Sequence, residues 1–189
     1  MKSHKTPLRY PGGKSRACTK MDQYLLKVSD CNEYREPFLG GGSVAIYITK
    51  KYPKLDIIWV NDLYEPLYNF WRVLQDDGNA LYETLCDLKS RHAEPESAKE
   101  LFLKSKEYLN DESNNDSLQR AVSFYIINKC SFSGLTESSS FSKQASDSNF
   151  SMRGIEKLPG YTKIIENWKI TNQSYENLLT DWKDVFTYL

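Results

Sequence analysis

The sequence is poor in the residues that hold metal ions. It has only two histidines, and its four cysteines (Cys18, Cys31, Cys86 and Cys130) show no CxxC or comparable ligand spacing. This argues against a structural zinc site. Free thiols in a reducing compartment are the simplest account of the cysteines.

Long apolar runs are also missing. No stretch reaches the length that a bilayer requires, and the N-terminus carries no apolar signal core. We therefore expect a soluble, cytoplasmic protein. A chain of 189 residues, 40% of them hydrophobic, has the length of one domain or of a domain with a sizeable insertion.

Net charge is absent as well, because 25 basic residues balance 25 acidic ones. No global field therefore marks nucleic acid as a partner. Residues 1–21 are an exception, since they hold six lysines and arginines and no acid. Such a basic arm is either simply solvated or contacts phosphates.

What the chain does contain is a glycine-rich stretch, residues 36–43 (Glu-Pro-Phe-Leu-Gly-Gly-Gly-Ser). It lies between residues 32–35, a short run that suits a strand, and residues 44–52, which have helical spacing. Successive glycines cost backbone entropy, so they indicate either a tight turn or close approach of the backbone to a ligand beside a helix N-terminus. Ser43 could cap that helix.

The next segment favours the ligand. Residues 55–60 (Leu-Asp-Ile-Ile-Trp-Val) predict a buried strand, and Asn61-Asp62 follows it. Asp62 lies 20 positions after Gly42, where nucleotide-binding βαβ units place the carboxylate that accepts the ribose hydroxyls. Alone, the dipeptide is typical of a turn. Together with the glycine loop it favours a ribose-containing ligand.

A second glycine element covers residues 7–15 (Pro-Leu-Arg-Tyr-Pro-Gly-Gly-Lys-Ser). Gly-Lys-Ser suggests a P-loop, but Leu8 stands where that motif needs its first glycine. What remains is a Pro/Gly turn in which Lys14 is either exposed or reaches an anionic group such as a carboxylate. A helix is expected to follow over residues 15–28.

The middle of the chain predicts helices from Glu65-Pro66 onward, two more over 79–110 with a break at Glu94-Pro95, and one over 118–130. Nine of the 21 residues from 131 to 151 are serine, interleaved with Phe132, Phe141 and Phe150. This segment is either a flexible linker or a loop that orders on a partner and contacts bases. Strands are expected over 168–171 and 184–189.

This order of elements resembles the Dam-class (D12 family) adenine-specific DNA methyltransferases of phages and bacteria, some of which serve restriction–modification. The matching segments are 7–14, 36–43, the strand ending in Asn61-Asp62, and 128–136 (Asn-Lys-Cys-Ser-Phe-Ser-Gly-Leu-Thr). The resemblance implies an α/β, Rossmann-like methyltransferase sheet that binds S-adenosyl-L-methionine. It assigns residues 1–77 and 161–189 to that cofactor domain and 78–160 to a helical and Ser-rich DNA-recognition insertion.

The resemblance also implies site residues. Those for the cofactor are Tyr10, Gly12 and Lys14 over its methionine end, Phe38, Gly40 and Gly42 beneath it, Asp62 on its ribose, and Tyr175 beside its adenine. Those for double-stranded DNA are Arg9, Arg16, Lys129, Ser131, Ser133 and Arg153. The residues by themselves indicate the ribose acid and the backbone loop, but they do not separate this cofactor from NAD.

The implied reaction is methyl transfer to N6 of an adenine flipped out of the duplex. The family's catalytic tetrapeptide, Asp-Pro-Pro-Tyr, is not in this sequence. In the family it follows a strand like residues 185–189, and the family sheet has seven strands where about four are expected here. A last strand left open would be a pairing hazard. A truncated product, a split enzyme completed by a second chain, and a degenerate remnant all remain open.

Two other classes of function compete with the enzyme. One is a non-catalytic protein that binds S-adenosyl-L-methionine or DNA as a regulator. The other is a Rossmann-type dehydrogenase. The latter is disfavoured because the glycines read Gly-Gly-Gly-Ser rather than Gly-x-Gly-x-x-Gly, and because no candidate hydride-transfer His or Tyr-x-x-x-Lys stands out.

Overall fold

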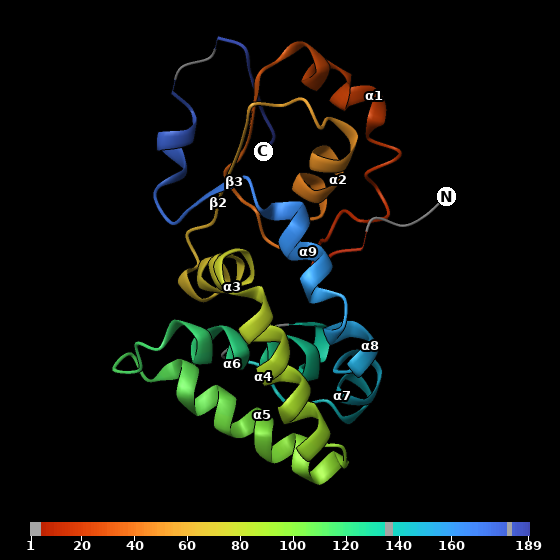
Figure 1. Cartoon of the computed structure of the whole chain (residues 1–189), viewed down its shortest axis with the longest axis vertical. Coiled ribbons are helices and arrows are strands. Elements are labelled where there is room, and N and C mark those ends of the chain that lie inside the picture. Colours follow the sequence, from red (N-terminus) through yellow and green to blue (C-terminus); the bar gives the residue numbers. More distant parts are fainter. Residues whose placement is uncertain (1–4, 135–137, 181–182) are drawn as a thin grey trace. The chain divides into compact units, whose positions relative to one another are not determined.

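The structure contains a parallel β-sheet, built from strands near both ends of the chain. The computed structural model describes residues 5–134, 138–180 and 183–189. Within these ranges, four parallel strands pair in the order β3-β2-β1-β4. The neighbouring strands β2 and β3 are labelled in Figure 1. The strands are β1 (Glu33–Glu36), β2 (Ile57–Asn61), β3 (Trp168–Thr171) and β4 (Val185–Thr187). The expected α/β class is confirmed. Strands β2 and β3 are added on one side of β1, and β4 is added on its other side, so the strand order changes direction between β1 and β4.

The helices follow the sequence pattern closely after residue 42. Their bounds are α1 (Asp22–Leu25), α2 (Ser43–Lys51), α3 (Glu65–Asp76), α4 (Gly78–Arg91), α5 (Pro95–Asn110), α6 (Ser117–Cys130), α7 (Lys143–Asn149), α8 (Met152–Ile155) and α9 (Leu158–Ile165). Short 3-10 turns add η1 (Leu26–Asp30), η2 (Phe132–Gly134) and η3 (Tyr175–Leu178). The helices expected from residue 65 to residue 130 are confirmed.

Two local expectations near the N-terminus are wrong. Residues 15–20 form turns rather than a helix, because their side chains are tied to the start of α2. The Ser15 hydroxyl lies 2.9 Å from that of Ser43, and the Cys18 thiol donates to the Ser43 carbonyl at 3.6 Å. Ser43 does not cap α2 either. Gly42 is the N-cap, in a left-handed conformation, with no side-chain cap bond.

The contacts divide the chain into two compact units. A sheet unit comprises Met1–Thr6, Gly12–Tyr68 and Ile164–Leu189, and a helical unit comprises Pro7–Pro11 and Asn69–Lys163. The chain therefore passes from one unit to the other within α3 and again within α9. The domain bounds expected from the resemblance, at 77/78 and 160/161, stay a prediction. The short segment 7–11 groups with the helices.

One face of the sheet carries the apolar core of its unit. Tyr34, Ile58, Val60, Trp168 and Ile170 are buried on it in register, and the indole of Trp168 donates to Thr49 of α2 at 2.8 Å. These contacts explain why alternate residues of short strands are apolar.

The opposite face is polar and is built around one aromatic ring. Arg35 of β1 and Lys169 of β3 both lie over the indole of Trp59 on β2, at 5.1 and 3.4 Å from the ring centroid. The Arg35 guanidinium also donates to Glu33 at 2.7 Å. Two cations therefore share one ring face-on, an arrangement stabilised by the ring quadrupole.

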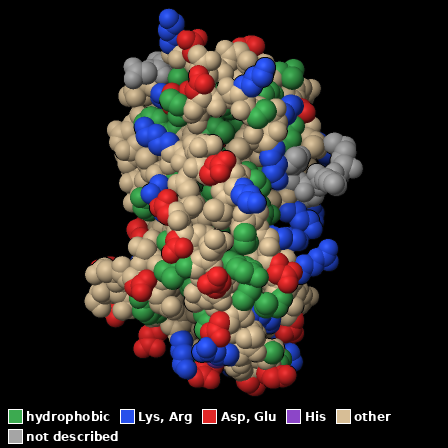
Figure 2. All heavy atoms as spheres, in the orientation of Figure 1, with side chains coloured by type: hydrophobic (Ala, Val, Ile, Leu, Met, Phe, Trp, Pro, Cys, Tyr) green, Lys and Arg blue, Asp and Glu red, His purple; other side chains and the backbone are tan. Residues whose placement is uncertain are grey.

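The helical unit has an aromatic core. Phe70 of α3 lies 5.8 Å from the ring of Phe124 and 6.0 Å from that of Tyr125, both on α6, and all three side chains are buried. On the face in Figure 2, acidic and basic side chains are interspersed.

The Ser-rich segment is ordered in its described part, which contradicts the linker alternative there. Phe150 is fully buried beneath Lys89, and Phe141 packs edge-on against Phe102 of α5 at 5.7 Å. The Phe150 ring is therefore not available to stack on bases, and the Phe141 ring is only partly exposed. Only Phe132, of the three phenylalanines, remains 69% exposed. The linker alternative rested on the polar composition of this segment. It fails because α4 and α5 supply side chains against which Phe150 and Phe141 pack.

All four cysteines are free thiols, with Cys18 and Cys130 buried. Among the residues that the structure describes, no helix is long and apolar enough to cross a membrane.

A close approach between α4 and α9 yields a stability prediction. A Cβ on Gly78 would lie 2.1 Å from Thr162 Oγ1, which donates to the Leu74 carbonyl at 2.8 Å. Gly78→Ala should therefore lower the free energy of unfolding by about 1–3 kcal/mol, since Thr162 cannot turn away without losing that bond. Denaturant unfolding measures the change.

Gly160→Ala is the matched control, because a Cβ there meets nothing within 4 Å. It should raise the free energy of unfolding by about 0.5–1 kcal/mol through helix propensity. Equal denaturation midpoints for Gly78→Ala and the wild type would contradict the packing argument.

Candidate functional site

The glycine loop links β1 to α2 in a conformation that needs glycine. Gly40 and Gly42 have φ of 51° and 67°, in the left-handed region that side chains disfavour. The Leu39 amide donates to the Asn61 carbonyl at 2.9 Å, and the Gly42 amide donates to Leu39 at 2.9 Å. The loop is thereby held at the carboxyl ends of β1 and β2, beside the start of α2.

Asp62 ties this loop to the segment after β2. Its carboxylate accepts the Gly40 amide at 2.8 Å and the Tyr64 amide at 3.1 Å, one on each oxygen. Burial raises the pKa of Asp62, and these two hydrogen bonds oppose the rise. A carboxylate has about four acceptor positions, so capacity for a ligand hydroxyl remains.

Asn61 is a structural residue of the site that the sequence reasoning treated only as part of a turn. Its buried side-chain amide donates to the carbonyls of Pro37 at 3.2 Å and Gln173 at 3.0 Å. Its oxygen accepts from the Thr171 hydroxyl at 2.8 Å and the Gln173 amide at 3.1 Å. One side chain therefore joins the ends of β1, β2 and β3.

Asn172, which directly follows β3, forms similar cross-links to the segment after β2. Its amide donates to the carbonyls of Asp62 at 2.8 Å and Leu63 at 2.9 Å. The asparagines that directly follow β3 and close β2 are the sequence signal that could have indicated these cross-links.

Phe38 and Tyr175 form an aromatic pair at the same edge. Their ring centroids are 5.5 Å apart with planes tilted by 36°. The side chains remain 58% and 44% exposed. Paired aromatic rings that stay this exposed offer a surface on which a flat heterocycle can pack.

Glu36 is a second carboxyl group in this region, and the sequence reasoning missed it. It is buried, accepts the Tyr34 hydroxyl at 2.8 Å, and accepts the Ala45 amide in the first turn of α2. Burial raises its pKa from 4.5 to about 8, and the nearby Asp62 adds to the rise. The sequence signal that could have indicated Glu36 as a site residue is its position at the end of β1, directly before the glycine loop.

The segment that leads into this unit carries Gly12, Lys14 and Arg16. Gly12 has φ of 75°, and the Lys14 ammonium donates to its carbonyl at 2.8 Å. Both Lys14 and Arg16 are exposed. The Thr6 hydroxyl donates to the Gly41 carbonyl, which attaches the start of the chain to the glycine loop.

In the helical unit, Asn128 holds residues 7–11 through the backbone of Arg9. The Arg9 amide donates to Asn128 at 2.9 Å, and the Asn128 amide donates to the carbonyls of Arg9 at 2.6 Å and Gly134 at 3.0 Å. Gly134 has φ of 74°, and a Cβ there would lie 2.7 Å from Arg9. Tyr10, next in the chain, is partly exposed.

The residues expected to contact DNA are placed unevenly. The Arg9 guanidinium donates to the Ser131 carbonyl at 2.7 Å, and Ser131 itself is fully buried. Lys129 is 8% exposed, with its ammonium 5.1 Å from the Tyr125 ring centroid, and burial lowers its pKa to about 8. Arg153 is exposed. The side chain of Ser133 lies outside the described residues.

Buried Lys129 and Ser131 thus support the interior rather than present a surface. The site assignments for the cofactor and for DNA stay predictions.

A parallel sheet with a glycine loop, an acid after β2 and an exposed aromatic pair at the carboxyl edge is an arrangement typical of nucleotide-binding α/β proteins. The sequence profile described as "D12 class N6 adenine-specific DNA methyltransferase" matches residues 10–189, and the chain belongs to this family.

A curated relative is the "Type II methyltransferase M.MjaIII" of Methanocaldococcus jannaschii. It is 31% identical to this chain over 134 residues. The aligned part covers 68% of this chain and 46% of the relative, so the match spans about half of that protein's length.

The buried Glu36 carboxyl predicts a pH dependence of stability. A carboxyl whose pKa rises on folding holds its proton more tightly in the folded state, so its contribution is full at low pH and is lost as the pH rises through about 8. Between pH 4.5 and 8, wild-type unfolding free energy should fall relative to Glu36→Gln, by at most about 1.4 kcal/mol per pH unit.

Denaturant unfolding of both proteins across this range measures the difference. Parallel pH profiles would contradict the raised pKa.

Proposed function

We propose that this chain binds S-adenosyl-L-methionine at the carboxyl edge of its sheet, for methyl transfer to N6 of adenine in DNA. The observation that carries the proposal concerns the Asp62 carboxylate. It accepts a hydrogen bond from the Gly40 amide and retains acceptor positions for a ligand hydroxyl. Membership of the D12 family supports the choice of this cofactor over NAD.

Each part of the cofactor has a candidate partner in the sheet unit. Asp62 would accept the ribose hydroxyls, and Phe38 with Tyr175 would pack against the adenine ring. The N-terminal turn, with Gly12 and Lys14, would hold the methionine end, where the Lys14 ammonium suits the carboxylate. S-Adenosyl-L-methionine supplies a methyl group on a sulfonium, and a cationic ligand would lower the pKa of the neutral Glu36 carboxyl.

DNA binding is proposed for the helical unit and the basic arm. Phe132 and Arg153 are exposed on the helical unit, and Arg16 is exposed on the arm. An exposed phenylalanine can stack on a base and an arginine can contact phosphate. The target adenine must leave the duplex before its amino group can react.

The chemical step itself is assigned to no residue of this chain. Adenine N6 is a poor nucleophile because its lone pair is delocalised into the ring, so it needs hydrogen-bond acceptors. In the family these belong to Asp-Pro-Pro-Tyr, which the 189 residues do not contain. The proposal therefore concerns binding of cofactor and DNA by this chain.

Calorimetric titration with S-adenosyl-L-methionine tests the cofactor site. Asp62→Ala should weaken binding by about 1–3 kcal/mol, the usual cost of lost hydrogen bonds to a buried polar group. Asp62→Asn keeps one acceptor for the Gly40 amide and separates loss of the ribose contact from collapse of the loop. Asp56→Asn, an exposed acid before β2, is the control and should bind as the wild type does. Unchanged affinity in Asp62→Ala would remove Asp62 from the site.

Methyl transfer from labelled S-adenosyl-L-methionine to unmethylated duplex DNA tests the assignment of the chemical step. We expect the purified chain to bind the cofactor without labelling DNA. Label that disappears in Asp62→Ala would show that catalysis proceeds without Asp-Pro-Pro-Tyr and would contradict that assignment.

A further inference from the structure

A basic groove on the helical unit lies within residues 78–160 but includes none of the DNA-contact residues named above. One wall is a single face of α5, formed by Pro95, Glu96, Lys99, Phe102, Leu103 and Lys106, and the other is the segment 139–143 that leads into α7. Its volume is about 600 Å³. The spacing of the α5 residues, three or four apart, explains why they share one face.

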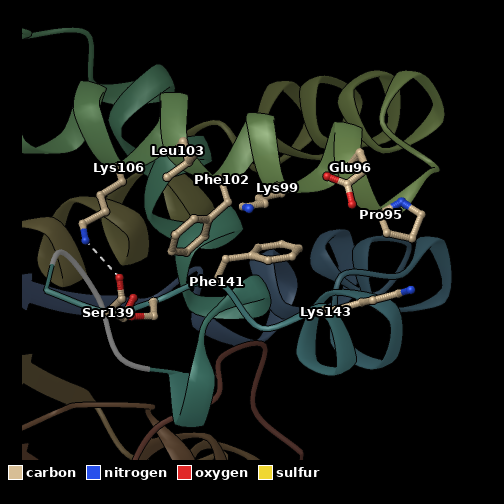
Figure 3. A pocket seen from close by; sticks show the side chains of 10 residues that line it. Pro95, Glu96, Lys99, Phe102, Leu103, Lys106, Ser139, Phe141 and Lys143 are labelled. Carbon is tan, nitrogen blue, oxygen red and sulfur yellow. Dashed lines mark hydrogen bonds between the residues drawn. The ribbon is translucent and has the colours of Figure 1, made fainter.

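The floor of the groove is apolar. In Figure 3 the side chains of Phe102 and Phe141 point toward each other across it, and their ring centroids are 5.7 Å apart. Leu103 adds an aliphatic side chain that is 53% exposed. An apolar floor of this kind fits a sugar ring better than a charged group.

Cations line its rim. Lys99 and Lys143 are exposed, and Lys106 donates to the Ser139 carbonyl at 2.9 Å, which attaches the two walls (Figure 3). The one carboxylate among the described lining residues is Glu96, in the first turn of α5, where the helix dipole favours it. The groove is therefore positive in a chain whose net charge is zero.

The groove is continuous with the segment expected to contact DNA. Ser131 forms an antiparallel bridge with Phe141, and the Phe132 amide donates to the Ser140 carbonyl at 3.3 Å. The Ser142 amide donates to Cys130 at 2.8 Å. One wall of the groove is thus bonded to the backbone that carries the exposed Phe132.

We propose that this groove holds the sugar–phosphate backbone of duplex DNA, with Lys99 and Lys143 on phosphates and the side chains of Phe141 and Leu103 against deoxyribose. The inference rests on the proposed function, because it takes DNA as the substrate. Ammonium groups above an apolar floor match a polymer that alternates anionic phosphates with apolar sugar faces. An acidic protein would offer carboxylates without that alternation.

Fluorescence anisotropy of a labelled duplex tests the proposal, with the 189-residue chain at several salt concentrations. The Lys99→Gln/Lys143→Gln double variant removes two charges without disturbing the Lys106 bond. Each phosphate contact adds about 0.9 to the slope of log affinity against log salt, so the slope should become shallower by about 1.8. Affinity at about 0.1 M salt should fall at least tenfold.

Lys54→Gln/Lys104→Gln is the matched control. It makes the same change in net charge, and Lys104 lies on α5 but outside the groove, paired with Glu100 at 2.7 Å. The control should keep the wild-type slope. Glu96→Gln should strengthen binding, since it removes the one carboxylate of the described lining. Equal thermal midpoints check that the variants are folded.

The outcomes separate the two proposals. A wild-type chain that binds duplex DNA, with a double variant that keeps its slope, overturns the groove and leaves the proposed function standing. A wild-type chain that binds no duplex overturns both. If oligoglutamate of equal charge competes as well as unlabelled duplex, the groove is a general acidic-partner site and the assignment to DNA backbone fails.

Discussion

The sheet unit depends on how the carboxyl ends of three parallel strands are held together. Parallel strands end at one edge with backbone groups unpaired, and here Asn61 and Asp62 satisfy them with side chains. The single side chain of Asn61 forms hydrogen bonds to the segments that follow β1 and β3. The positive φ of Gly40 then follows, because its amide must point at the Asp62 carboxylate. The loop geometry is a consequence of these buried polar bonds, which cost several kcal/mol if left unmade.

A similar constraint organises the helical unit. Asn128 satisfies both backbone groups of Arg9 and one of Gly134, and Gly134 has no room for a Cβ. The segments 7–14 and 128–136, which carry the family resemblance, are thus bonded to each other through residues 9, 128 and 134. Their matching pattern reflects a polar clamp as much as contact with any ligand.

Local sequence signals predicted much of this fold. The Pro at the second position of α3, the Glu94-Pro95 break and the apolar run before Asn61-Asp62 each act over a few residues, and the elements appear where these signals indicate. The failures concern distant partners. Residues 15–20 are tied to Ser43, and Phe150 is covered by Lys89, so neither could be inferred from neighbours in sequence. Burial of Glu36 likewise depends on Tyr34 and α2 together.

Burial also changes which residues can meet DNA. Lys129 and Ser131 fall within the matching motif, but an ammonium that is 8% exposed and a fully buried serine offer little to a phosphate. A cation that must bind DNA gains most when it is solvated in the free protein and close to phosphates in the complex, because binding then releases counterions. Lys99 and Lys143 of the α5 groove are exposed to solvent, and Lys143 follows the wall that is hydrogen-bonded to Ser131 and Phe132. In the proposed complex, the motif would act as the support and the adjacent groove would supply the charge.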